Sequence, residues 1–197
     1  MSLPAADAFA AVTPIIEALE QLQVSYHIGG SFAIAAYGVP RASVDVDLVA
    51  ELRLEHVEWF VARLQGRYYV NGERVREAIL EQSSFNLVDM ETAMKVDVFI
   101  PERTPFADQE QARARSELFE VALGPRFFFV KSPEDLVLRK LRWYRDGGEV
   151  SERQWSDVVG LLRAQAVMLD DEYLRRWATE LGVTDLLQRS MAVARGN

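Results

Sequence analysis

Hydrophobic positions change between helical and strand spacing along the first 130 residues. Apolar residues recur every three or four positions over 6–23, which predicts an amphipathic helix. Short alternating or continuous apolar runs follow, and further helical segments separate them. The predicted strands are 24–28, 44–49, 84–89, 94–100, 117–122 and 127–130, with a strand or turn at 67–70. The predicted helices between them are 32–37, 54–65, 73–80 and 106–115.

The pattern after residue 130 is helical throughout. Ser132-Pro133-Glu134-Asp135 is typical of a helix start, with Ser at the N-cap, Pro at the first helical position and a carboxylate at the third. The helices predicted from there are 133–145, 151–168, 170–181 and 183–194. We therefore predict an α+β protein, with a small mixed sheet and flanking helices in residues 1–130 and a C-terminal helical subdomain in 131–197.

The composition narrows the class of protein. The chain has 197 residues, 49% hydrophobic and 26% charged, as in a soluble globular protein. The absence of cysteine excludes disulfides and thiolate catalysis, and two histidines disfavour a multi-histidine metal site or a Ser-His-Asp hydrolase. No apolar run approaches the roughly 20 residues that span a bilayer, and the N-terminus is a poor signal peptide. We expect a cytoplasmic protein without a membrane partner.

Charge is distributed unevenly along the chain. The net charge is −8, of which residues 1–100 carry −7. Residues 126–145 form a basic stretch with six basic and two acidic residues. This stretch fits a polyanion such as a triphosphate or RNA, and it equally fits an ordinary basic helix surface.

Three aspartates carry the candidate chemistry. Asp45 and Asp47 are two residues apart on a predicted strand, so both carboxylates lie on one face, roughly 6.5–7 Å apart. Asp97 lies in another strand-like segment and completes a triad if the two strands are neighbours. Hard carboxylate oxygens are the ligands that Mg²⁺ prefers, and such a triad can hold two metal ions for phosphoryl or nucleotidyl transfer. The alternative is that the Asp-x-Asp pattern is the solvated face of an edge strand.

A glycine-rich turn precedes the aspartates. Gly29-Gly30-Ser31 stands between a predicted strand and a predicted helix, with Ser31 as a candidate N-cap. Glycine allows a ligand close to the main chain, and free amides at a helix N-terminus favour phosphate. The order of strand, Gly-Gly-Ser turn, short helix and Asp-x-Asp strand is more specific than either motif alone.

The segment GGSFAIAAYGVPRASVDVDL resembles the signature of the polymerase-beta-type nucleotidyltransferase superfamily. The Gly-Gly-Ser-x-Ala form, Arg41 and Ser43 before the aspartates, and the Lys-x-Asp strand are most similar to the bacterial abortive-infection toxin-like branch. The resemblance covers about residues 24–165. It implies the nucleotidyltransferase fold, triphosphate binding by Gly30 and Ser31, and metal binding by Asp45 and Asp47. It also implies Asp97 as the third carboxylate, acting as a general base or metal ligand.

The three lysines are candidate phosphate contacts, because lysine binds phosphate as a point charge. Lys140 is our first candidate for a contact with the triphosphate or the acceptor, and Lys131 is the second. Lys95 shares the face of the third aspartate and is a candidate to neutralise the carboxylates. The resemblance places Asp157 in support of Lys140 or an arginine; the alternative is pairing with Arg153 or Arg139. Arg41 is a candidate for a phosphate contact or for a structural role, in which it pairs with Asp45 or positions the loop.

Together these features predict a nucleotidyltransferase that moves an NMP from an NTP to an acceptor and releases pyrophosphate. It would use Mg²⁺, two ions by the triad argument, with Mn²⁺ as a substitute. ATP is a candidate donor, although the sequence does not select the NTP. The acceptor stays open between tRNA or another RNA, a protein and a small molecule. The alternatives are a non-catalytic nucleotide- or protein-binding member of a toxin–antitoxin pair, whose partner would be a cognate antitoxin, and an antibiotic-type small-molecule nucleotidyltransferase.

Overall fold

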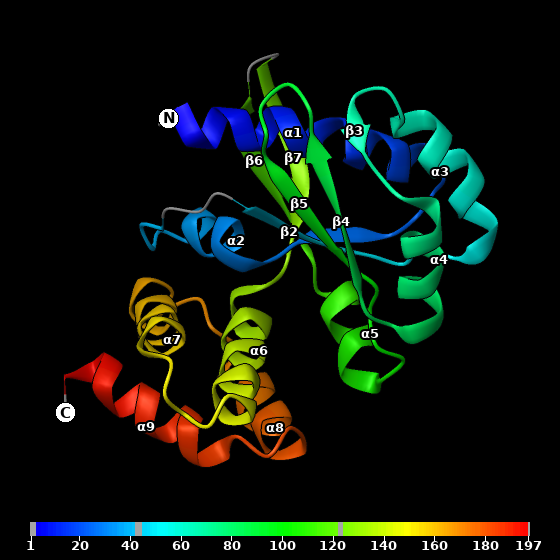
Figure 1. Ribbon diagram of the computed structural model, residues 1–197. Helices are drawn as coiled ribbons and strands as arrows, with labels where there is room; N and C mark the ends of the chain where they lie inside the picture. Colours follow the sequence, from blue (N-terminus) through cyan, green and yellow to red (C-terminus); the bar gives the residue numbers. More distant parts are fainter. Residues whose placement is uncertain (1–2, 42–44, 122–123, 197) are drawn as a thin grey trace. The chain divides into compact units, whose positions relative to one another are not determined.

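The computed structural model describes residues 3–41, 45–121 and 124–196. The chain forms two compact units. The first unit contains Met1–Phe32 and Ala42–Val130, and the second contains Ala33–Arg41 and Lys131–Asn197. Figure 1 shows the helices and strands of both units and labels most of them.

The first unit contains a mixed sheet, seven-stranded within the described residues, in the order β3-β4-β5-β2-β1-β7-β6. Its strands are β1 (Tyr26–Ile28), β2 (Asp45–Ala50), β3 (Tyr68–Tyr69), β4 (Ser84–Asp89), β5 (Lys95–Phe99), β6 (Arg115–Val121) and β7 (Gly124–Val130). Two neighbouring pairs, β2–β5 and β1–β7, are parallel, and the other pairs are antiparallel.

In the described part of the first unit, five helical segments accompany the sheet. They are α1 (Leu3–Gln21), the 3₁₀ turn η1 (Leu54–His56), α3 (Val57–Leu64), α4 (Gly72–Glu81) and α5 (Pro105–Ala112). Helix α1 contacts α3, β2, β5 and β6, so it runs across one face of the sheet. Strand β2 turns Val46, Leu48 and Ala50 into the core below this helix and leaves Asp45 and Asp47 on the opposite face.

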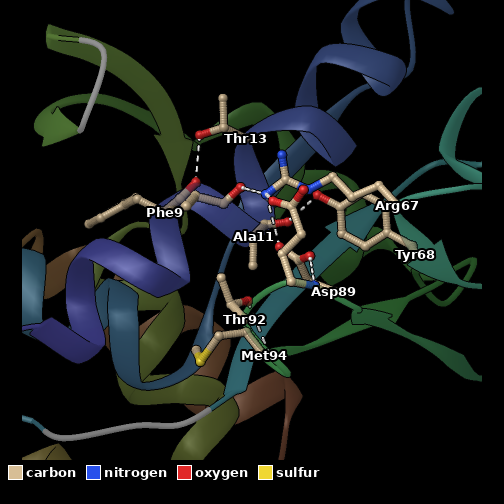
Figure 2. A network of polar contacts seen from close by, with 10 residues as sticks. Phe9, Ala11, Thr13, Arg67, Tyr68, Asp89, Thr92 and Met94 are labelled. Carbon is tan, nitrogen blue, oxygen red and sulfur yellow. Dashed lines mark hydrogen bonds and ion pairs between the residues drawn. The ribbon is translucent and has the colours of Figure 1, made fainter.

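A polar network joins α1 to the far edge of the sheet. Pro14 lies inside α1 and has no N–H, so the carbonyl of Ala10 loses its usual intrahelical donor. Arg67 Nη2 donates to that carbonyl at 2.8 Å and to the fully buried Asp89 at 2.9 Å. The hydroxyl of Tyr68 donates to the carbonyl of Ala11 at 2.8 Å. Figure 2 shows these side chains converging between the helix and the strands.

The second unit is helical. It contains α6 (Pro133–Asp146), α7 (Glu152–Ala164), α8 (Asp171–Glu180) and α9 (Thr184–Arg195). It also takes in most of α2 (Gly30–Ala36) and the residues that follow it to Arg41. Ser132 Oγ accepts from the backbone N–H of Asp135 at 3.2 Å, which confirms the predicted N-cap of α6.

The predicted fold class is confirmed, because a mixed sheet with flanking helices is followed by a helical region. Several boundaries differ. The strand 24–28 is only three residues long, and the helix 54–65 is divided into η1 and α3. The helix 151–168 ends at Ala164, where the Gln165 side chain donates to the carbonyl of Tyr37.

One cap was wrong: α2 begins at Gly30, so Ser31 lies inside the helix rather than at its N-cap. Residues 44 and 122, predicted as strand ends, lie outside the described residues. Among the helices that the structure describes, none has the length and apolar character needed to cross a membrane.

Candidate active site

Strands β2 and β5 place the three aspartates on one face of the sheet. The two strands are parallel neighbours, and their register pairs Asp47 with Asp97 and Asp45 with Lys95. Paired residues in adjacent strands point to the same face and lie about 5 Å apart. The condition for the predicted triad, that the two strands be neighbours, is therefore met.

Lys95 lies among the carboxylates. Its Nζ is 2.8 Å from Asp97 Oδ2 and 3.9 Å from Asp45 Oδ2. The hydrogen bond to Asp97 raises the pKa of Lys95 above its ordinary value, and the charges of the three aspartates act in the same direction. The lysine side chain is 39% exposed and that of Asp97 is 22% exposed, so this face is open to solvent. Lys95 is thus placed as the counter-ion that the sequence suggested.

Gly30 forms a close support for Asp47. A Cβ atom added to Gly30 would lie 1.6 Å from Asp47 Oδ2 and 2.6 Å from its Cγ, so only glycine leaves room for this carboxylate. Gly30 also has a φ of +56°, in the left-handed region that favours glycine. The backbone N–H of Gly29 donates to the carbonyl of Asp47 at 2.8 Å. The Gly-Gly turn is therefore fitted to the second aspartate of the Asp-x-Asp pair.

This contact was not anticipated from the sequence, which assigned Gly30 to phosphate alone. The available signal was the double glycine one short helix before the aspartates. Ser31, predicted to bind phosphate, is buried in the first turn of α2. Ser43 lies outside the described residues.

The chemistry of the donor set fits a divalent cation. Asp45, Asp47 and Asp97 offer only hard carboxylate oxygens, and all three lie on one partly exposed face. Within residues 3–41, 45–121 and 124–196, no group of three or more His, Cys, Asp or Glu side chains is close enough together to hold a metal ion. The residues that would hold Mg²⁺ are neighbours in the sheet, and Lys95 contacts the carboxylate of Asp97.

The other predicted site residues lie in the second unit. Asp157 is buried in α7, with Lys140 Nζ at 2.9 Å from Oδ2 and Arg41 Nε at 3.2 Å from Oδ1. The ion pairs therefore join Asp157 to Lys140 and to an arginine, as the resemblance implied. The alternative partners, Arg153 and Arg139, were wrong. Arg41 has its ion pair with Asp157 rather than the predicted structural role with Asp45.

The basic stretch is largely neutralised within each unit. In the first unit, Arg126 donates to Glu17 at 2.7 Å and to Glu20 at 2.9 Å. In the second unit, Arg142 pairs with Asp146, Arg145 pairs with Asp185, and Lys140 pairs with Asp157. Lys131 and Arg139 also have interaction partners, and Lys131 is buried. The stretch is therefore not a free cationic surface.

We compared the chain with known protein families, curated proteins and solved structures. No family model matches the chain, and no curated protein matches it. Among solved structures, it is similar to an antigenic nucleotidyltransferase-like protein from Paracoccidioides brasiliensis, with a TM-score of 0.54 and 14% identity over 97% of this chain and 98% of that one. This similarity shows that the chain has a nucleotidyltransferase-like fold.

Two other solved structures match with lower TM-scores. The antibiotic-resistance factor ANT(2'')-Ia gives a TM-score of 0.46 and 21% identity, over 94% of this chain and 87% of that one. The lincosamide antibiotic adenylyltransferase LnuA gives a TM-score of 0.44 and 14% identity, over 76% of this chain and 93% of that one. The resemblance to the abortive-infection branch stays a prediction.

Proposed function

We propose that this protein is a Mg²⁺-dependent nucleotidyltransferase that transfers an NMP from an NTP to an acceptor. One observation carries the proposal: Asp47 and Asp97 are register partners on parallel strands, with Asp45 on the same face. Like charges on adjacent strands are destabilising unless cations offset them, and the single charge of Lys95 leaves these four side chains with a net charge of −2, which a bound metal ion would offset. The close fit between Gly30 and Asp47 supports the same conclusion, because it fixes one carboxylate beside a glycine-rich turn.

Each residue has a role in this reaction. Asp45 and Asp47 would hold the metal, while Gly30 and Ser31 would contact the triphosphate through the first turn of α2. When bound, Mg²⁺ would neutralise the triphosphate and the departing pyrophosphate. Asp97 accepts the proton of the acceptor hydroxyl. The acceptor oxygen then bonds to the α-phosphorus, the bond between that phosphorus and the bridging α–β oxygen breaks, and pyrophosphate leaves.

Lys95 orients the proposed base. Its ammonium lies 2.8 Å from Asp97 Oδ2, and its raised pKa keeps it protonated at neutral pH. The hydrogen bond leaves the second carboxylate oxygen of Asp97 for the acceptor. We assign a triphosphate contact to Lys140 and, secondarily, to Lys131, with Asp157 and Arg41 as the residues that position Lys140. These assignments rest on the motif and on the ion pairs at Asp157.

The charge distribution favours a small cationic acceptor over RNA. Residues 1–100 carry a net charge of −7, which attracts cations and repels a polyanion. The basic stretch was the argument for RNA, and four of its six basic residues, Arg126, Lys140, Arg142 and Arg145, are paired with acidic residues in their own units. An amino sugar is the acceptor class that we would test first, as in an antibiotic-type nucleotidyltransferase.

The experiment follows the label in an NTP. Each of the four NTPs, labelled at the α- or the γ-phosphate, is incubated with Mg²⁺ and an amino sugar, tRNA or a carrier protein. We expect α-label to move to the amino sugar while γ-label leaves in pyrophosphate. The Asp45→Asn/Asp47→Asn variant should lose transfer by at least about 100-fold. Its melting temperature should be unchanged or higher, because fewer like charges repel one another.

Three results would contradict the proposal. Movement of γ-label to an acceptor would indicate a kinase. Full transfer by the double variant would remove both aspartates from the mechanism. A stable complex with one partner protein and no turnover with any NTP would favour the non-catalytic member of a toxin–antitoxin pair.

A further inference from the structure

A separate pocket lies in the first unit, at the carboxyl ends of the parallel strands β2 and β5. Its volume is about 770 Å³, within the range of small-molecule sites. Residues 51–55 follow β2 and residues 100–105 follow β5 along its walls, and the C-terminal end of α4 and the first turn of α5 complete them. The crevice beyond the carboxyl ends of parallel strands is a common ligand position in open sheets that mix helices and strands.

The pocket is distinct from the carboxylate cluster. Glu51 follows Asp47 by four residues on the same extended segment, which corresponds to about 13 Å along the strand. The residues that would bind Mg²⁺ do not line the pocket. A ligand in the pocket would therefore leave the aspartates uncovered.

The pocket has an apolar base and an exposed apolar rim. Four buried side chains contribute to its lining: Leu52, Ile79, Ile100 and Ala107. Leu54 and Leu80 also line it, yet they are 49% and 70% exposed. Two exposed leucines beside a hollow of this size leave apolar surface in water, which a ligand with an apolar body would cover.

The charges around the pocket favour a cation. Four carboxylates line it, from Glu51, Glu55, Glu102 and Asp108, against the guanidinium groups of Arg53 and Arg103. Arg53 Nη1 lies 3.9 Å from Glu55 Oε1, so part of the positive charge is already paired. The remaining excess is negative, in a chain whose net charge is −8.

The helix ends at the pocket also favour a positively charged ligand. The C-terminal end of α4, capped by Gln82, presents carbonyl groups, which favour a cation. The first turn of α5 would favour an anion, but most of its donors are used or missing. Pro105 has no N–H, and the N–H of Ala107 donates to Thr104 Oγ1 at 3.2 Å.

We propose that this pocket binds a primary ammonium ligand that carries an apolar body. The ammonium contacts the carboxylates of Glu102 and Asp108, and the hydrocarbon covers Leu80 and the buried base. The ligand class follows from the pocket alone and does not depend on the proposed nucleotidyl transfer.

The test uses three probes of equal chain length: n-hexylammonium, hexanoate and 1-hexanol. Each is titrated into the ¹⁵N-labelled full-length protein without nucleotide, and amide shifts are followed. We expect saturable shifts at Leu52, Gln82 and Arg103 with hexylammonium. Hexanoate should bind about tenfold more weakly, because the excess negative charge repels it.

Matched variants locate the site. Leu80→Ser should weaken hexylammonium binding by about threefold or more, because it removes apolar contact. Leu118→Ser is the control, since Leu118 is 55% exposed on β6 and does not line the pocket. Glu102→Gln/Asp108→Asn should reduce the preference for hexylammonium over hexanoate. Asp45→Asn/Asp47→Asn should leave binding unchanged, which separates this site from the proposed active site.

Three outcomes would overturn the proposal. They are equal binding of hexylammonium and hexanoate, shifts confined to residues outside the pocket, and equal losses from Leu80→Ser and Leu118→Ser. Because all four altered side chains in the Leu80, Leu118, Glu102 and Asp108 variants are exposed, their folds should be retained. Amide spectra of the unliganded variants check this directly.

Discussion

At the scale of single residues, the fit between Gly30 and Asp47 links the sequence motif to the proposed chemistry. The φ of Gly30 and the position of the Asp47 carboxylate both require the absence of a side chain at residue 30. Glycine-rich turns are commonly explained by close approach of a ligand to the main chain. Here the closest atom to the missing Cβ belongs to the protein itself, so the glycine also positions a carboxylate.

Gly30→Ala should therefore displace the Asp47 carboxylate and impair Mg²⁺-dependent NTP binding by at least about tenfold. The left-handed backbone alone costs an alanine roughly 1–2 kcal/mol. Gly182→Ala is the matched control, because Gly182 has a φ of +68° with nothing within 4 Å of an added Cβ. Calorimetric titration and urea unfolding of both variants measure the two effects. Equal NTP binding by Gly30→Ala and wild type would remove this positioning role.

Asp89 gives a prediction for pH. Burial alone would raise its pKa, but hydrogen bonds from Arg67 and from the backbone of Glu91 bring the pKa below its ordinary value. A carboxylate whose pKa is lowered by folding stabilises the protein above its unfolded pKa of about 3.9. That stabilisation is lost as the pH falls through the lower, folded-state value.

Urea unfolding between pH 3 and 6, a range set around the ordinary carboxyl pKa, tests this contribution. Stability should fall with acidification in the wild type, and part of that slope should be missing in Asp89→Asn. An identical slope in both proteins would show that Asp89 does not titrate as described. The control is Asp108→Asn, which removes an exposed carboxylate on α5.

At the scale of elements, α1 and the strand β3 depend on each other. Pro14 leaves the carbonyl of Ala10 without its intrahelical donor, and Arg67 supplies a substitute while it neutralises Asp89. Arg126 of β7 also forms ion pairs with Glu17 and Glu20 of α1. These contacts hold the long helix across the sheet whose opposite face carries the three aspartates.

Arg67→Ala should destabilise the protein by about 3–5 kcal/mol, because it leaves the buried Asp89 without its ion pair. Arg74→Ala should cost less than about 1 kcal/mol, since the ion pair of Arg74 with Glu77 on α4 is exposed. Urea unfolding at pH 7 compares the two variants. Similar losses would indicate that the network around Pro14 contributes no more than a surface ion pair.

Patterns among neighbouring residues predicted most helices and strands. They did not predict contacts between residues that are far apart in the sequence. The capped start of α6 and the strands β4 and β5 depend on neighbouring residues, so the sequence was sufficient to predict them. The pairing of β2 with β5 joins residues about 50 positions apart, and the sequence could state it only as a condition. Arg41 and Asp157 are further apart still, and no periodic pattern connects them. The N-cap at Ser31 failed because α2 begins at Gly30, two residues earlier than a helix capped by Ser31 would begin.

At the scale of the whole molecule, the chain passes between the two units more than once. Ala33–Arg41 belongs to the second unit although the segments on both sides belong to the first. Within the second unit, Arg41 pairs with Asp157, and a Cβ on Gly160 would lie 3.0 Å from Val39. The helical region 131–197 is therefore incomplete without residues 33–41.

A fragment of residues 131–197 should be less stable than the same region in the full chain. It lacks the Arg41–Asp157 ion pair and exposes the surface that Val39 covers, so it should show poorly dispersed amide signals. Addition of a peptide with residues 33–41 should increase the dispersion, and the same peptide with Arg41→Ala should do so less. A fragment as well dispersed and as heat-resistant as the full protein would show that the second unit is formed by 131–197 alone.

The proposed function depends most on the carboxylate face of β2 and β5, and calorimetric titration of α,β-methylene NTP analogues tests it most directly. The full-length protein is titrated with each analogue, with Mg²⁺ and with a chelator, beside the Asp45→Asn/Asp47→Asn variant. We predict that one analogue binds saturably with Mg²⁺, and that the chelator or the double substitution weakens this binding by at least about tenfold. Binding that is equal in the variant, or no binding of any analogue by folded wild-type protein with Mg²⁺, would contradict the proposed function.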